Sequence, residues 1–110
     1  MDYEEAVGIY RAIRNTKASE EFATVEEVAI RYAGARVEYL RAESEQKRWL
    51  GPDRAATHNQ FISACDILSR RMRELNEDVS WRSVLGNDRR RLGDFACMIH
   101  CILGIAAGAF

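Results

Sequence analysis

Residues 58–75, with the sequence HNQFISACDILSRRMREL, decide the fold class of this chain. Apolar side chains and one histidine recur there in alternating steps of three and four residues, which places them along one face of an α-helix. The same helical period recurs in other segments, and no segment shows the strict alternation of a half-buried β-strand. An all-α fold is therefore predicted. The inward-facing residues of this helix are His58, Phe61, Cys65, Leu68, Met72 and Leu75.

Capping signals predict two helices before this stripe. The first helix follows Asp2, whose carboxylate suits an N-cap, and it ends near Asn15. The second is expected to begin with a capping box at Thr24 and to run to about Trp49, where the pair Gly51-Pro52 ends it. Its inward stripe continues through Tyr32 and Val37 to Leu40.

The second half of the chain predicts two further main helices and one short helical turn. The third helix starts after Pro52, and residues 80–85 form the short turn. The last helix is apolar on every side beyond Phe95, so we expect it to lie at the centre of a compact bundle. Residues 1–110 are expected to form a single domain. The short turn is expected to bury Trp81, Val84 and Leu85.

The charge balance excludes a strong general attraction to nucleic acid. Sixteen basic and seventeen acidic side chains give a net charge of −1, whereas nucleic-acid-binding modules usually carry a basic excess. The odd number of cysteines and the acidic N-terminus indicate neither a disulfide framework nor a signal peptide, so a cytoplasmic protein is expected.

Residues 95–110 carry no charged side chain and are the one segment that resembles a membrane anchor. As a helix they would span about 24 Å, which is shorter than the hydrocarbon core of about 30 Å. A buried helix is therefore the better prediction, with no membrane involvement.

The chain lacks the sequence signatures of common enzymes: there is no glycine-rich phosphate loop, no HExxH and no GxSxG. Acid–base catalysis would require convergence of the scattered titratable residues His58, Asp66, Asp94 and His100. A lone histidine in an apolar helix is more often a core residue, so no enzyme is predicted.

Cys97, His100 and Cys101 share one side of a helix and are soft metal ligands. His58 or Cys65 would complete a tetrahedral zinc site. Cysteine also packs as a small apolar group, and the tight ligand spacing of structural zinc sites is absent. We predict neither a metal nor another cofactor.

The triplet Arg89-Arg90-Arg91 is the most informative local feature. If the last helix begins at Asp88, three cations occupy its first turn, where the helix dipole favours anions, and an acidic surface or a phosphate would compensate them. The alternative we favour is a helix that starts near Ser80, with the arginines at mid-helix in salt bridges to Asp88, Asp94 or a neighbouring helix. In either case the candidate partner- or anion-binding residues are Arg70, Arg71, Arg73, Arg82, Arg89, Arg90 and Arg91.

The end of the chain favours a homodimer. Two glycines four residues apart would allow a second helix to approach closely. So apolar a helix is also difficult to cover within a chain of 110 residues. The predicted oligomer interface consists of Ile102, Gly104, Ile105 and Gly108.

These observations favour a non-catalytic protein-interaction module whose partner has an acidic surface. It would be a small adaptor, or a stoichiometric regulator or inhibitor of the type that phages and mobile elements use against host defence. Two alternatives stay open: a helical bundle that binds a nucleotide or another anion through the arginine cluster, and a small nucleic-acid-binding protein.

Overall fold

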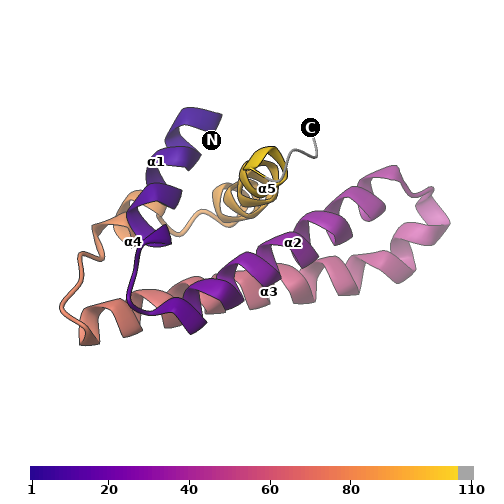
Figure 1. Ribbon diagram of the computed structural model, residues 1–110. Coiled ribbons are helices and arrows are strands. Elements are labelled where there is room, and N and C mark those ends of the chain that lie inside the picture. Colours follow the sequence, from indigo (N-terminus) through magenta and orange to yellow (C-terminus); the bar gives the residue numbers. More distant parts are fainter. Residues whose placement is uncertain (107–110) are drawn as a thin grey trace.

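The fold is built on a long helical hairpin formed by α2 (Ser19–Arg41) and α3 (Ser44–Glu74). The computed structural model describes residues 1–106, with side chains to residue 104. Helix α5 (Arg89–Ala106) lies over this hairpin, and α1 (Tyr3–Arg14) and the short α4 (Ser80–Leu85) cover the end opposite the α2–α3 turn (Figure 1). The predicted all-α bundle of four main helices and one short helical turn is confirmed.

One apolar core joins all five helices. Phe61 of α3 and Phe95 of α5 are fully buried at its centre, with ring centroids 6.2 Å apart. The stripe that defined α3 in the sequence faces this core; only its last member, Leu75, is partly exposed. A periodic apolar stripe in sequence thus identified the buried face of this helix correctly.

Helix α5 contacts α1, α2 and α3, which places it centrally in the bundle. Its burial is less complete than the sequence predicted. Leu92, Phe95 and Ile99 face the core, whereas His100 on the opposite side is exposed and Cys97 and Cys101 beside it are partly exposed. The remaining helices cover one face of α5 but do not surround it.

Helix α2 begins at Ser19, five residues before the predicted capping box at Thr24. The Thr24 hydroxyl instead donates to the Glu20 carbonyl within the helix. The chain before α2 is held by Glu77, from the link between α3 and α4, whose carboxylate accepts from the backbone N–H of Lys17 at 3.1 Å. A carboxylate 60 residues away therefore helps to hold this helix start, together with the local bond from the Ala18 N–H to the Thr16 hydroxyl.

The predicted end of the second helix at Gly51-Pro52 is wrong. Helix α2 ends at Arg41, Ala42 takes an extended conformation, and Glu43 begins α3 with a reciprocal capping box to Gln46. Pro52 lies inside α3, on its exposed side, where the hydrogen bond that proline cannot donate leaves the freed carbonyl close to water.

The links around α4 differ from the prediction in two ways. Trp81 and Leu85 are buried as expected, but Val84 is 57% exposed. Gly86, at φ 77°, ends α4, so the last helix does not start near Ser80. It begins at Arg89, with the Asp88 carboxylate accepting from the N–H groups of Arg90 and Arg91. The arginine triplet occupies the first helical turn, contrary to the alternative we favoured.

The turn between α2 and α3 projects beyond the other helices (Figure 1), and the molecule measures 48 × 28 × 23 Å. Within residues 1–106, no helix is both long and apolar enough to cross a lipid bilayer.

Candidate functional site

The seven arginines predicted as one patch are dispersed in the structure. Three of them are bound to acidic side chains of the same chain: Arg71 to Glu21 and Glu74, Arg82 to Asp66, and Arg91 to Glu5. Arg70 and Arg73 are exposed on α3, where their side chains pair with no residue that the structure describes. Arg89 and Arg90 line one cavity together.

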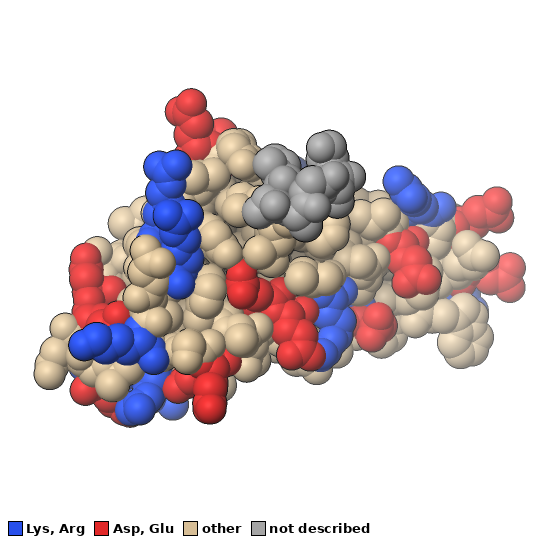
Figure 2. Space-filling model, in the orientation of Figure 1, with Lys and Arg blue, Asp and Glu red and all other residues tan. Residues whose placement is uncertain are grey.

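Three of these arginines therefore stabilise the fold. Arg82 also donates to the Gly86 carbonyl, and Arg91 donates to the carbonyls of Val84 and Leu85, so both satisfy backbone groups at the end of α4. On the face shown in Figure 2, basic and acidic side chains are interspersed over the helices, without one extended basic area.

A cationic cavity of about 380 Å³ lies where α2, α3 and the start of α5 meet. Four arginines line it, and we call it the arginine pocket. Arg89 and Arg90 were predicted as binding residues, whereas Arg36 of α2 and Arg54 of α3 were missed. The complete lining is Tyr32, Arg36, Tyr39, Leu40, Arg54, Ala55, His58, Arg89 and Arg90.

His58 links α3 to the first turn of α5 in this pocket. Its Nε2 donates to the Arg89 carbonyl at 2.8 Å, and its Nδ1 accepts from the Arg89 guanidinium at 3.0 Å. This pair of bonds requires the neutral ring. Burial lowers the pKa of His58 below its usual value; the hydrogen bond to the Arg89 carbonyl opposes this shift, and the positive charges of Arg89, Arg54 and Arg36 add to it.

The lowered pKa of His58 predicts a loss of stability on mild acidification. Below about pH 6.5 the unfolded chain binds a proton that the folded chain does not, so the free energy of unfolding falls as the pH approaches the folded-state pKa. Urea unfolding at pH 7.5 and 5.5 measures the difference. A His58→Gln variant, which keeps a donor for the Arg89 carbonyl, should show a smaller change; an identical change in both proteins would contradict the prediction.

The arginine side chains of the pocket have hydrogen-bond or ion-pair partners for only some of their N–H groups. Arg36 pairs with Asp94 at 2.9 Å, and Arg89 donates to Asn59 at 2.7 Å. Arg54 lies over the Tyr39 ring at 4.6 Å, and its buried Nε has no hydrogen-bond partner among the described residues. The side chain of Arg90 also pairs with none of them.

The sequence contained a signal for the two missed arginines. Arg36 follows Tyr32 by four residues, and Arg54 precedes His58 by four, so each lies one helical turn from a residue that the sequence predicted to face inward. Their convergence with Arg89 depends on the crossing of three helices, which the sequence does not show.

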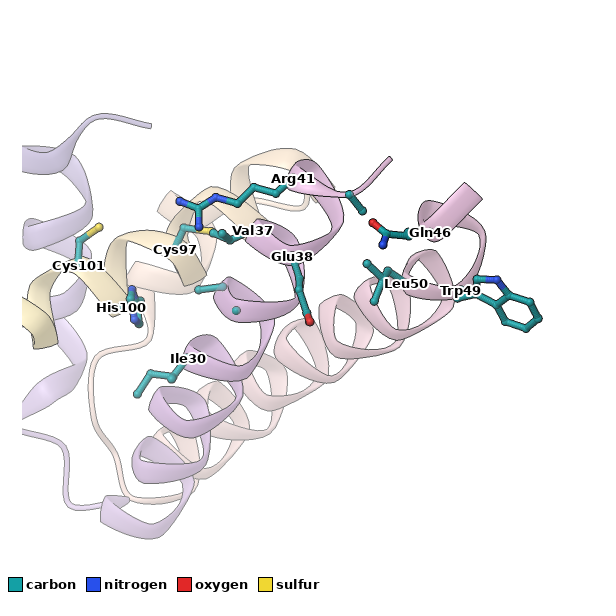
Figure 3. Close-up of a pocket in the computed structure, with 13 residues that line it drawn as sticks. Ile30, Val37, Glu38, Arg41, Gln46, Trp49, Leu50, Cys97, His100 and Cys101 are labelled. Atoms are coloured by element: carbon teal, nitrogen blue, oxygen red, sulfur yellow. The ribbon is translucent and has the colours of Figure 1, made fainter. Parts of the chain in front are cut away.

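A second cavity, of about 910 Å³, is predominantly apolar and lies beside the projecting α2–α3 turn. We call it the apolar groove. Ile30, Val37 and Arg41 extend along one face of α2, and side chains of α5 face them (Figure 3). The first turns of α3 close the far end. The complete lining is Ile30, Ala33, Gly34, Val37, Glu38, Arg41, Ala42, Gln46, Trp49, Leu50, Cys97, His100 and Cys101.

Large apolar side chains are exposed in and around the groove. Ile30 and Val37 are each 44% exposed, and Trp49 is 77% exposed at the end of the hairpin. The sequence placed Val37 on the inward stripe of its helix. In the structure Val37 lines the groove and is not buried, so this part of the prediction is wrong.

The four candidate acid–base residues do not form one cluster. His58 lies in the arginine pocket and His100 in the apolar groove, while Asp66 and Asp94 pair with Arg82 and Arg36.

The candidate zinc ligands are also separated. Cys97, His100 and Cys101 line the groove, whereas Cys65 is fully buried in the core and His58 lies in the arginine pocket. Within the described residues, no three His, Cys, Asp or Glu side chains are arranged to hold a metal ion.

Of the predicted oligomer interface, Ile102 and Gly104 are partly exposed near the end of α5. The side chain of Ile105, and Gly108, lie outside the described residues. The predicted dimer is therefore untested by the structure of this single chain.

The two cavities are the candidate functional sites, and they lie on different sides of α2. Comparison of the chain with protein-family models, curated proteins and solved structures gives no match.

Proposed function

We propose that this protein is a non-catalytic protein-interaction module, an adaptor or a stoichiometric regulator, that binds one helix of a partner protein in the apolar groove. The observation that carries the proposal is the exposure of Ile30, Val37 and Trp49 around one concave apolar surface. Contiguous exposed apolar surface of this kind usually marks an interaction site.

The arrangement of the helices favours a helical ligand. Helix α5 packs over the middle of the α2–α3 hairpin, and no third helix of residues 1–106 lies over the turn end of the hairpin (Figure 1). Ile30, Gly34 and Val37 follow the helical spacing along α2, so they form one continuous strip. Gly34 is exposed, and a Cβ built there would meet no atom within 4 Å, so a helix can approach closely.

The charges at the rim indicate what the partner helix would carry besides apolar residues. The Arg41 side chain pairs with no carboxylate of the described residues, so it is available to an acidic side chain of the partner. Glu38 also lies at the rim and would disfavour a second acidic residue beside it. The expected ligand is therefore an amphipathic helix with one acidic residue placed to reach Arg41, rather than the acidic surface that the sequence predicted opposite the arginine cluster.

The test is selection of binders from a displayed library of amphipathic helical peptides, followed by affinity measurement through the fluorescence of Trp49. Val37→Glu places a carboxylate in the groove and should weaken the selected peptides by about 100-fold, because an unpaired charge would be buried. The matched control is Ile67→Glu, at an apolar position of α3 that is 51% exposed and lies outside the groove.

Three outcomes would contradict the proposal. These are a library that yields no binder, binders that Val37→Glu and Ile67→Glu weaken equally, and a homodimer that Val37→Glu dissociates. The last, detected by light scattering, would assign the groove to a second copy of the chain.

A further inference from the structure

We propose that the arginine pocket is a binding site for a small molecule that carries a phosphate or diphosphate group. The charges of the pocket are the first argument. Four guanidinium groups line it, one is neutralised by Asp94, and His58 is held in its neutral form by its two bonds to Arg89. An excess of three positive charges in one concavity favours a ligand with two or more negative charges, as in a phosphate monoester or a diphosphate, over a single carboxylate.

The unused hydrogen-bond donors are the second argument. The Arg90 guanidinium has no described partner, and the buried Nε of Arg54 has none either. A buried donor without an acceptor costs about 1–3 kcal/mol, which an anionic oxygen in the pocket would offset. The planar fork of arginine also matches two oxygens of a phosphate group.

The start of α5 adds little to the positive potential of the pocket. Its dipole places partial positive charge beside Arg89 and Arg90, but the Asp88 carboxylate that caps the helix carries a full negative charge at the same end. The Asp88 carboxylate already accepts from the N–H groups of Arg90 and Arg91. Side-chain guanidinium groups, rather than these backbone N–H groups, would therefore hold the ligand.

The size of the site favours a small molecule over a nucleic acid. The pocket encloses about 380 Å³, and the chain as a whole has a net charge of −1. A nucleic-acid surface needs basic residues spread along several phosphates, whereas here the uncompensated charge is concentrated at one point.

The experiment uses titration calorimetry with pyrophosphate, inorganic phosphate and acetate as probes. We expect pyrophosphate to bind more tightly than phosphate, and acetate to give no measurable heat. ADP carries the same diphosphate with a nucleoside attached, so its affinity relative to pyrophosphate shows whether a nucleoside contributes.

Arg90→Gln and Arg54→Gln should each weaken pyrophosphate binding by about tenfold or more, the effect of removing one charge-assisted hydrogen bond. The matched control is Arg70→Gln, at an exposed arginine of α3 outside the pocket whose side chain has no described partner, and it should leave the affinity unchanged. Because Arg54 packs on Tyr39, circular dichroism must show that its variant is folded, and the exposed Arg90 supplies the independent variant.

NMR supplies a second measurement that does not depend on a variant. A bound dianion would stabilise the imidazolium form, so saturating pyrophosphate should raise the pKa of His58. Absence of binding at millimolar pyrophosphate, equal weakening by Arg70→Gln, or an unchanged His58 titration at saturation would overturn the proposal. So would a single-stranded oligonucleotide whose affinity rises with its length while pyrophosphate does not bind.

Discussion

Replacing Trp81 with alanine is expected to lower the free energy of unfolding by about 3–5 kcal/mol, the usual cost of deleting a large buried aromatic side chain. Trp81 is only 2% exposed, and together with Leu85 it fixes the short helix α4 to the core. Six residues form too short a helix to be stable alone, so α4 depends on this packing. Urea unfolding followed by circular dichroism measures the change.

The matched control is Trp49→Ala, which removes the same side chain at a position that is 77% exposed. That variant should change the free energy of unfolding by no more than about 0.5 kcal/mol. Trp81→Phe keeps most aromatic contacts and removes an indole N–H that has no described partner, so it should cost less than alanine. Similar losses in Trp81→Ala and Trp49→Ala would show that Trp81 is not part of the core.

Replacing Gly93 with alanine is expected to destabilise the protein by about 1–3 kcal/mol, as overpacking of a tight core usually does. A Cβ at this position would lie 2.8 Å from the Tyr32 hydroxyl and 3.3 Å from His58 Nε2. Gly93 therefore allows α5 to approach α2 and α3 closely, beside the arginine pocket. Alanine would force Tyr32 or His58 to move and would weaken the bond from His58 to the Arg89 carbonyl.

The control variant is expected to change the free energy of unfolding in the opposite direction. A Cβ at Gly8 of α1 meets no atom within 4 Å, so Gly8→Ala should stabilise the protein by about 0.5–1 kcal/mol through helix propensity alone. Tyr32→Phe removes the atom closest to the new methyl group, and Gly93→Ala should therefore cost less in that background. Destabilisation of equal size with and without the Tyr32 hydroxyl would place the strain elsewhere.

Local sequence signals correctly predicted the features that depend on residues close together in the sequence. The start of α1 was predicted correctly because Asp2 caps it by accepting from Glu5 N–H, three residues away. The buried face of α3 was predicted correctly because a stripe at steps of three and four can face only one side of a helix.

Elements held by distant partners were not predicted. Helix α2 begins at Ser19, beside a segment whose Lys17 N–H donates to Glu77, and the turn at Ala42 precedes the glycine–proline pair that the sequence favoured. The inward stripe of α2 predicted burial of Val37, which the assembled helices leave 44% exposed.

The candidate sites, too, were predicted only in part from the sequence. Sequence alone determined that the chain is helical and which residues of α3 face the core. It also indicated that the positive charges of Arg89 and Arg90 must be compensated by anionic groups. Only the tertiary structure decided that Arg91 bonds Glu5 while Arg89 and Arg90 meet Arg36 and Arg54 in one pocket. The physical reason is the sequence separation of the interacting residues. Helical period and capping depend on neighbours within one turn, whereas the convergence of charges depends on how helices that are far apart in the chain cross.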